Sequence, residues 1–315
     1  MNQPPEEIRF KVLTLDGGGA KGFYTLGILR ELEAAAGKPL AQFFDAIYGT
    51  STGAIIAALL GLGRSVSETL KLYEEHVPKI LGAKGAIGKS SQLKATAEEL
   101  FTGLGWTDFK PAIGIIATNW THERPLIFKN RQEAAHRIKT TFIPGFGCTI
   151  AEAVRASCSA TPFFESCPLD LKNDGKIEAR DGGFSANNPS LFSLTDVLNG
   201  LGILPENVRI LTLGVGHYPE PKRSWWKKRV QRFTPVHLLQ KTLNINANTT
   251  EILTKYLLPA VPQIRISDRF ESPELATDFL ETNMSKLNLL VQKGRESFRQ
   301  RETELNKFFN NYGKN

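Results

Sequence analysis

The fold of this chain is decided by two stretches of sequence, VLTLDGGGAKG at residues 12–22 and GTSTG at residues 49–53. In the second stretch, Ser51 stands between two glycines, where an apolar strand predicted over residues 44–48 meets an apolar helix predicted over residues 52–62. Glycines at such a turn let the strand and the helix approach without a Cβ clash, and the serine takes an unusual backbone conformation. The pattern therefore predicts a nucleophile elbow that presents Ser51 at the N-terminus of a helix.

The first stretch has the same order of strand, turn and helix, with a strand predicted over residues 10–15 and a helix over residues 21–36. Between them, Gly17, Gly18 and Gly19 leave backbone N–H groups exposed, which suits them to holding an oxyanion. A phosphate-binding loop is the alternative. The loop has no Gly-Lys-Ser/Thr sequence, and no acidic residue ends a second strand about twenty residues further on, so neither common nucleotide fingerprint fits. We therefore interpret the glycine run as an oxyanion hole.

A third stretch, IEARDGGFSANNP at residues 177–189, places Asp181 at the end of a short extended run and before two glycines. Asp-Gly is among the commonest turn dipeptides, and on its own the pair indicates only a turn. Its position after the two earlier stretches, in that order, carries more information than the dipeptide alone.

Four motifs in this order resemble those of the patatin-like phospholipases, whose hydrolysis depends on a serine–aspartate dyad. They are DGGG at residues 16–19, GTSTG at 49–53, ASCSATPF at 156–163, and DGG followed by NNP within 181–189. The resemblance extends over about residues 9–216. It implies a three-layer α/β/α fold with a mainly parallel central sheet and with the dyad at the carboxyl-terminal ends of the strands.

The resemblance also implies a role for each motif residue. Ser51 attacks the ester carbonyl, and Asp181 takes its proton and returns it to the leaving alcohol. The backbone amides of Gly17, Gly18 and Gly19 hold the developing oxyanion. The residues expected to support the motifs are Lys21, Gly22, Gly49, Gly53, Gly182 and Gly183. Lys21 stands where the family often has arginine; it keeps the charge but lacks the fork that grips a carboxylate or phosphate, and its role stays open.

Two other interpretations remain at this point. His217 follows a buried strand predicted over residues 208–216, so Ser51, Asp181 and His217 have the chain order of an α/β-hydrolase triad. The second is a storage or lipid-binding protein that keeps the fold without catalysis, against which the intact Ser51 and Asp181 argue. The sequence has no histidine or cysteine spacing typical of a metal site, and we expect no metal and no cofactor.

The composition agrees with a soluble enzyme. The chain has 315 residues, 41% of them hydrophobic, which is enough for one large domain over residues 1–315. This domain joins the family motifs at 9–216 to a basic, helical extension at 217–315. The longest apolar stretch, residues 54–62, is too short to span a bilayer, and residues 1–7 do not form a secretory signal. With three cysteines that suit reduced thiols, we expect a cytoplasmic enzyme working at the inner face of the membrane.

Strands and helices alternate along the chain, which predicts a mainly parallel sheet with helices on both faces. The other elements expected are strands near 112–118 and 125–129 and helices near 65–81 and 149–156. Residues 82–91 are rich in Gly and Lys without any periodicity, and are predicted to form a flexible loop. Between residues 273 and 309, apolar residues recur at roughly helical intervals, which predicts helices that pack on the main domain.

Positive charge is concentrated in one segment of this chain, whose formal net charge is +7. The segment is KRSWWKKRVQRF at residues 222–233, and indoles beside cations suit a lipid headgroup interface. The residues expected to contact an anionic ligand or a membrane are Lys222, Arg223, Trp225, Trp226, Lys227, Lys228 and Arg229. A basic run can equally be a solvated face. No RNA-binding signature accompanies it, so we expect no nucleic acid polymer as a partner.

The length, the basic C-terminal region and the lack of a signal sequence resemble one group within the family. These are the bacterial patatin-like effectors of anti-phage defence that cyclic nucleotides activate. The resemblance implies a lipid acyl hydrolase that releases fatty acids from membrane glycerophospholipids and is switched on by a cyclic nucleotide. Phosphates of such a ligand would meet the cations of the basic segment, and a base would stack on one of its tryptophans.

Overall fold

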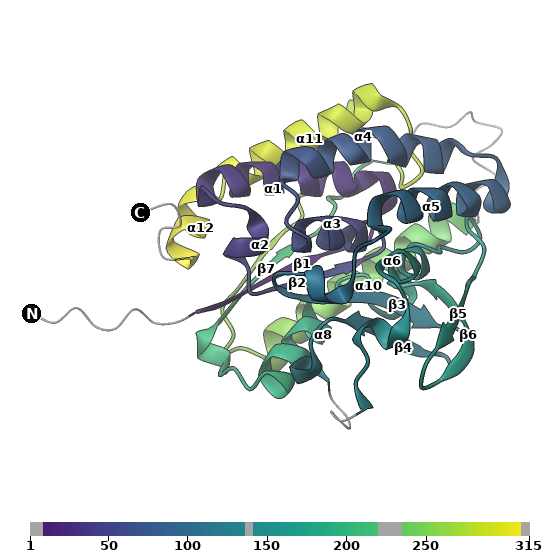
Figure 1. Cartoon of the computed structure of the whole chain (residues 1–315). Helices are drawn as coiled ribbons and strands as arrows, with labels where there is room; N and C mark the ends of the chain where they lie inside the picture. Colours follow the sequence, from purple (N-terminus) through teal and green to yellow (C-terminus); the bar gives the residue numbers. More distant parts are fainter. Residues whose placement is uncertain (1–8, 136–140, 220–234, 310–315) are drawn as a thin grey trace, which may run out of the picture.

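In the part of the chain that the structure describes, eight strands form one central sheet with helices on both of its faces (Figure 1). The computed structural model describes residues 9–135, 141–219 and 235–309. The strands are β1 (Phe10–Leu15), β2 (Ala46–Thr50), β3 (Ala112–Asn119), β4 (Arg124–Lys129), β5 (Cys167–Leu171), β6 (Gly175–Asp181), β7 (Val208–Leu213) and β8 (Gln263–Ile266). Their order across the sheet is β5-β6-β3-β2-β1-β7-β8, and β4 also pairs with β3.

Five neighbouring strands, from β3 through β2, β1 and β7 to β8, run parallel, as the alternation of strands and helices predicts. β1 lies in the middle of these five, with Val12 opposite Ala46 of β2 and Ile210 of β7. Every residue of β2 and β3 is buried, because helices cover both faces of this part of the sheet. The carboxyl ends of the parallel strands therefore meet at one edge of the sheet, where ligands bind in folds of this kind.

Two strands of opposite direction meet head-on along one edge of β3. β2 runs parallel to the first part of β3 and ends with Thr50 opposite Ile116. β6 runs antiparallel to the last part of β3 and ends with Asp181 opposite Ala117. β4 pairs with β3 along both parts, so β4 takes the other edge and leaves β2 and β6 on the same one. The carboxyl ends of β2 and β6 consequently meet, and Ser51 and Asp181 lie at this junction.

The helices form a layer on each face of the sheet, which confirms the predicted three-layer α/β/α fold (Figure 1). One layer contains α1 (Gly22–Ala36), α2 (Leu40–Phe43), α3 (Thr52–Gly61), α4 (Val66–Gly82), α5 (Gly85–Phe101), α6 (Ile150–Ser157), α11 (Met284–Arg299) and α12 (Glu302–Phe308). The other contains α7 (Gly183–Ala186), α8 (Ser190–Thr195) and α10 (Pro235–Leu257). No helix within the described residues combines the length and the apolar character needed to cross a membrane.

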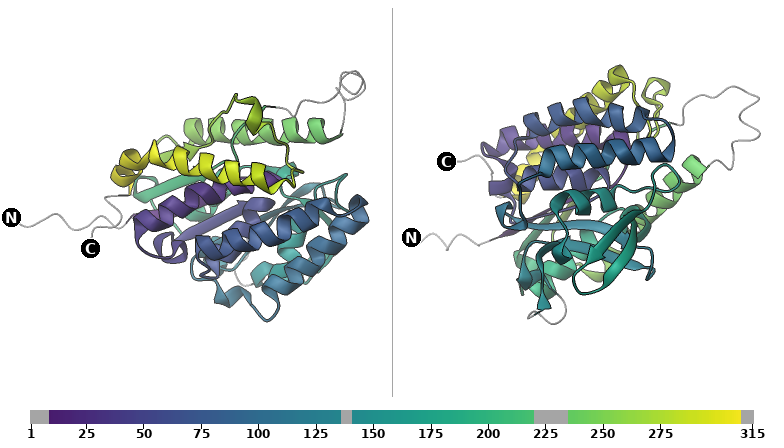
Figure 2. Two further views of the ribbon diagram at one scale, coloured as in Figure 1. Left: turned by 90° about the horizontal axis from the view of Figure 1, so that it is seen from above. Right: turned by 45° about the vertical axis from the view of Figure 1, so that its right-hand side comes forward.

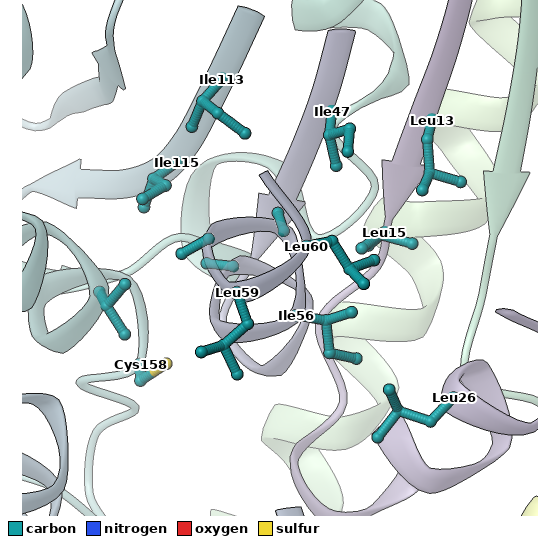
Figure 3. Close-up of a cluster of buried hydrophobic side chains, with 14 of the residues drawn as sticks. Leu13, Leu15, Leu26, Ile47, Ile56, Leu59, Leu60, Ile113, Ile115 and Cys158 are labelled. Atoms are coloured by element: carbon teal, nitrogen blue, oxygen red, sulfur yellow. The ribbon is translucent and has the colours of Figure 1, made fainter. Parts of the chain in front are cut away.

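The core is divided between the two faces because side chains alternate along each strand. Leu13, Ile47 and Ile115 point to the face of α3 and pack with its apolar side chains, as Figure 3 shows. The neighbouring positions Val12 and Tyr48 belong to a smaller cluster on the face of α7 and α8. Both clusters are almost fully buried. This packing fixes the carboxyl ends of the parallel strands in position.

The C-terminal helices pack on the main domain, as their apolar spacing predicts. α11 lies alongside α1, seen best from above in Figure 2. The backbones approach so closely that a Cβ on Gly27 would collide with the carbonyl oxygen of Val291, and one on Gly294 with that of Tyr24. Leu287 is fully buried in the core of this face. β8 also belongs to this C-terminal part, so the extension contributes a strand to the sheet and helices to both layers.

One prediction of local structure was wrong. Residues 82–91 were predicted to form a flexible loop, but α4 extends to Gly82 and α5 begins at Gly85. Glycines and serines disfavour a helix only weakly, and tertiary packing outweighs this preference. Here the later turns of α5 bury Leu93 and Phe101 against the core, which stabilises the whole helix.

Candidate active site

Ser51 occupies the sharp turn between β2 and α3. Its backbone angles, φ 53° and ψ −122°, lie in a region that side-chain-bearing residues rarely adopt. Glycines make the turn possible, since a Cβ on Gly49 would collide with the carbonyl oxygen of Gly53, and one on Gly53 with that of Leu15. The elbow geometry predicted from GTSTG is thus present, with Ser51 at the N-cap of α3.

A second serine, Ser157, forms a hydrogen bond with the backbone of the elbow. The N–H of Ser51 donates to Oγ of Ser157, 2.9 Å away, and Oγ of Ser157 donates to the carbonyl oxygen of Ile116. Ser157 is the last residue of α6 and is fully buried. It belongs to the ASCSATPF motif, and no pattern in the sequence indicates this contact. The hydrogen bond joins this motif to the elbow.

Asp181 is buried beside the elbow at the end of β6. Its Oδ1 accepts a hydrogen bond of 2.7 Å from the N–H of Gly183, whereas Oδ2 has no hydrogen-bond partner among the described residues. Burial raises the pKa of Asp181 to about 6, against the lowering effects of the Gly183 amide and the Ser51 hydroxyl. The turn after it needs glycine, because a Cβ on Gly182 would collide with the carbonyl oxygen of Ile116.

The glycine loop after β1 lies at the same junction, but its three amides are not equivalent. Gly18 and Gly19 line the pocket that contains Ser51, and no described residue accepts a hydrogen bond from either N–H. The N–H of Gly17 instead donates to the carbonyl oxygen of Asn187, 3.0 Å away. The expectation that Gly17 is a third oxyanion donor is therefore corrected, since its hydrogen is already used to attach the loop to the turn that follows Asp181.

The pocket around Ser51 and Asp181 has a volume of about 70 Å³ and is partly open to solvent. Apart from its polar end it is apolar, with side chains from α3, α4, α5, α10, the loop after α6 and the loop before α11. They are Ile55, Val77, Ile80, Leu81, Leu93, Phe164, Leu239, Leu243, Phe279 and Leu280. Cys158 also lines it, and burial raises the pKa of this thiol well above its usual value. A mostly apolar pocket with the serine and the carboxylate at one end suits the first part of the acyl chain of an ester.

Comparison with known proteins shows the family of this chain. The family model described as patatin-like phospholipase matches residues 13–191, which include both Ser51 and Asp181. The chain belongs to the patatin-like phospholipase family. A phospholipase of *Escherichia coli* named as activated by cUMP-AMP is 49% identical over 298 residues, covering 95% of this chain and 93% of the relative.

More distant relatives and solved structures extend the comparison. A phospholipase of *Pseudomonas aeruginosa* named as activated by cGAMP is 32% identical over 221 residues, which is 65% of this chain and 62% of the relative. The structure of VipD from *Legionella pneumophila* matches 94% of this chain and 67% of its own, with a TM-score of 0.52 at 14% identity. Human GIVD cytosolic phospholipase A2 matches 98% of this chain and 61% of its own, with a TM-score of 0.50 at 8% identity. The two structures support the fold alone.

Lys21 of this patatin-like chain is buried outside the pocket lining. Its Nζ lies 5.6 Å from the centre of the Tyr218 ring. Burial lowers the pKa of Lys21 to about 8, and Asp278 opposes the shift. The next residue, Gly22, lies against α3, where a Cβ would come within 2.7 Å of Oγ1 of Thr52. Both residues therefore join the glycine loop to its neighbours.

His217 does not join Ser51 and Asp181. It lines a second cavity, which shares no lining residue with the Ser51 pocket. Its pKa is lowered by burial and by the nearby cations Arg269, Arg265 and Lys21. This placement argues against a triad in the patatin-like site.

The basic segment lies outside the described residues. The residues predicted there to contact an anionic ligand or a membrane, Lys222, Arg223, Trp225, Trp226, Lys227, Lys228 and Arg229, therefore remain predictions. The three cysteines are free and buried, as expected for reduced thiols. Among the described residues, no group of three His, Cys, Asp or Glu side chains is placed to hold a metal ion.

Proposed function

We propose that this protein cleaves acyl esters of membrane glycerophospholipids with a dyad formed by Ser51 and Asp181. The observation that supports it most strongly is the head-on meeting of β2 and β6. It places a strained serine and a buried carboxylate at one end of an apolar pocket. A carboxyl group with a pKa of about 6 is mostly ionised at neutral pH, yet remains basic enough to accept a proton from a serine.

The chemistry takes two steps. Asp181 accepts the proton of Ser51 as Oγ forms a bond to the ester carbonyl carbon, and the amides of Gly18 and Gly19 hold the oxyanion. The intermediate collapses, Asp181 gives the proton to the leaving lysophospholipid oxygen, and the acyl group stays on Ser51. Water then attacks this ester, Asp181 takes the proton of the water and returns it to Oγ, and a fatty acid leaves.

We further propose that a cyclic dinucleotide switches this activity on. The support is the extensive identity, over almost the full length, with a relative named as activated by cUMP-AMP. An inactive resting state would protect the cell's own membrane from the phospholipase. It also fits the anti-phage role that the family resemblance implies.

The proposed membrane contact has a candidate surface on α10. Apolar side chains stand exposed along this helix, with Leu238, Ile245 and Ile252 seven residues apart on one face and Tyr256 81% exposed at its end. The adjacent side of the helix contributes Leu239 and Leu243 to the pocket. Replacing Ile245 and Ile252 by asparagine is expected to weaken sedimentation with anionic vesicles. Unchanged sedimentation would refute this face as the membrane contact.

Fatty-acid release from phospholipid vesicles tests the enzymatic proposal. With cUMP-AMP present, we expect Ser51→Ala and Asp181→Asn each to lower release by at least about 10³-fold. Ser67→Ala, which removes an exposed hydroxyl from α4, is the matched control and should match the wild type. EDTA should leave the wild-type rate unchanged. Normal release by Ser51→Ala would refute the proposed nucleophile, and a folded wild type that binds lipid without release would favour the non-catalytic alternative.

A further inference from the structure

A polar cavity lies between α10 and the loops that follow β7 and β8. It measures about 490 Å³ and is lined by His217, Tyr218, Pro219, Gln240, Lys241, Asn244, Arg269, Phe270 and Glu271. His217 and Arg269 pair across the two loops, with the N–H of Phe270 donating to the carbonyl oxygen of His217 at 2.8 Å. The mechanism described above uses none of these side chains.

The lining has the chemistry of a nucleotide site. Lys241 and Arg269 are exposed cations, and within the described residues neither forms an ion pair with a carboxylate. Tyr218 and Phe270 stack with ring centres 5.2 Å apart and planes 18° apart. The hydroxyl of Tyr218 is buried without a hydrogen-bond partner in the described part of the chain. Cations suit phosphates, and aromatic rings suit a base.

We propose that this cavity binds the cyclic dinucleotide activator, with its phosphates on Lys241 and Arg269 and a base beside the Tyr218–Phe270 pair. The inference rests on the proposed function, because it gives the activator a site. The amide side chains of Gln240 and Asn244 provide further donors and acceptors at the same wall.

The same turns of α10 reach both cavities. Gln240, Lys241 and Asn244 line the polar cavity, and their immediate neighbours Leu239 and Leu243 line the Ser51 pocket. A shift of these turns on ligand binding therefore changes the shape of the acyl pocket.

Side chains of α10 also connect to the turn that follows Asp181. Oδ1 of Asn246 accepts a 2.7 Å hydrogen bond from the N–H of Asn187, whose carbonyl oxygen holds the amide of Gly17. Leu243 fills the space against Gly183, where a Cβ would meet it at 2.5 Å. The helix thus contacts the segment that positions the base and, through Asn187, the oxyanion loop.

A second connection runs through a chain of ion pairs. Glu251 of α10 lies 3.0 Å from Nε of Arg265, and the same guanidinium lies 2.6 Å from Asp16, the residue before the glycine loop. Val215, in the loop that leads into the polar cavity, also packs where a Cβ on Gly18 would stand. A ligand that favours one position of α10 consequently favours one arrangement of the catalytic loops.

Binding measurements test the assignment of the site. Calorimetry with cUMP-AMP should show about a 10-fold weaker affinity for Lys241→Ala and for Arg269→Ala, and about 100-fold for the double variant. Lys71→Ala, which removes an exposed cation from α4, is the charge-matched control and should bind normally. Fatty-acid release should need correspondingly more nucleotide in the same variants. Wild-type affinity in the double variant would overturn the site.

Asn246 tests the connection to the catalytic turn. Asn246→Ala should bind cUMP-AMP normally but lose most of the activation, whereas Asn246→Asp keeps the acceptor oxygen and should restore it. Asn248→Ala, an exposed position on the same helix, is the control. Full activation of Asn246→Ala would refute the proposal that the Asn246–Asn187 hydrogen bond connects the nucleotide cavity to the catalytic turn.

The two proposals fail in different ways. Hydrolysis of a soluble short-chain ester reports the dyad without a membrane, so wild-type hydrolysis that Ser51→Ala abolishes confirms the chemistry independently of the nucleotide. If such an enzyme neither binds nor responds to cUMP-AMP or a panel of other cyclic dinucleotides, both the activator and its site are refuted while the hydrolase stands.

Discussion

The substitution Asp181→Asn should remove activity and at the same time stabilise the protein. The asparagine side chain has the shape of the carboxyl group, and its oxygen can keep the hydrogen bond from the Gly183 amide. Its NH₂ group takes the place of the oxygen that has no hydrogen-bond partner among the described residues. What the substitution removes is a buried charge.

The magnitude follows from the pKa. Burial raises the pKa of Asp181 from 3.8 to about 6, so the folded state binds this proton more tightly than the unfolded state. The stability that the Asp181 carboxyl group contributes is therefore fully present below pH 3.8. It is lost as the pH rises from 3.8 to about 6. Two pKa units correspond to about 3 kcal/mol at pH 8, and about half of that is lost by pH 5.

Urea denaturation at pH 8 and pH 5 measures the effect. Relative to the wild type, Asp181→Asn should gain about 3 kcal/mol of unfolding free energy at pH 8 and about half as much at pH 5. Glu178→Gln removes a charge from an exposed position on the same strand and is the matched control. An Asp181→Asn protein with no gain at pH 8, or with a gain that does not depend on pH, would refute the argument.

Three further predictions concern the glycine loop, the elbow and the polar cavity. Gly18→Val places a Cβ 2.5 Å from the Val215 side chain and displaces the glycine loop. We therefore expect kcat to fall about 10²-fold with little change in KM. A raised KM with normal kcat would show that the loop serves substrate binding. Ser157→Ala removes the acceptor of the Ser51 N–H and should cost about 1–3 kcal/mol of unfolding free energy as well as activity, and an unchanged denaturation midpoint would contradict this. Burial and the cations Arg269, Arg265 and Lys21 lower the pKa of His217, and Glu251 opposes the shift. This pKa should rise when the phosphates of cUMP-AMP bind in the polar cavity, which NMR titration with and without the nucleotide measures. An unchanged pKa would count against that site.

The parts of the site that the sequence predicted are those determined by local backbone geometry. A serine between glycines, where an apolar strand meets an apolar helix, specifies the elbow because only residues 49–53 and their immediate neighbours decide it. The parallel sheet followed in the same way from the alternation of strands and helices. The family motifs then indicated that Asp181 belongs beside Ser51, although 130 positions separate them in the sequence.

The parts that were not predicted depend on contacts between distant segments. Gly17 cannot be distinguished from Gly18 in the sequence, because only the carbonyl of Asn187 sets it apart. The role of Ser157 similarly depends on the position of Ile116. α5 forms where local propensity favours a loop, because its later turns are buried against the core. The connections of α10 to both cavities have no sequence signature.

Labelling with an alkyl fluorophosphonate tests the central claim most directly, because it measures the reactivity of Ser51 without a membrane. With cUMP-AMP present, the wild type should gain one label on the peptide that contains Ser51. The labelling rate should rise with pH to a plateau with a midpoint near 6, as Asp181 loses its proton. Asp181→Asn should be labelled far more slowly, whereas His217→Ala, with cUMP-AMP at a concentration that saturates this variant, should keep the wild-type midpoint. Labelling at another residue, or a rate that depends on His217 and not on Asp181, would contradict the dyad.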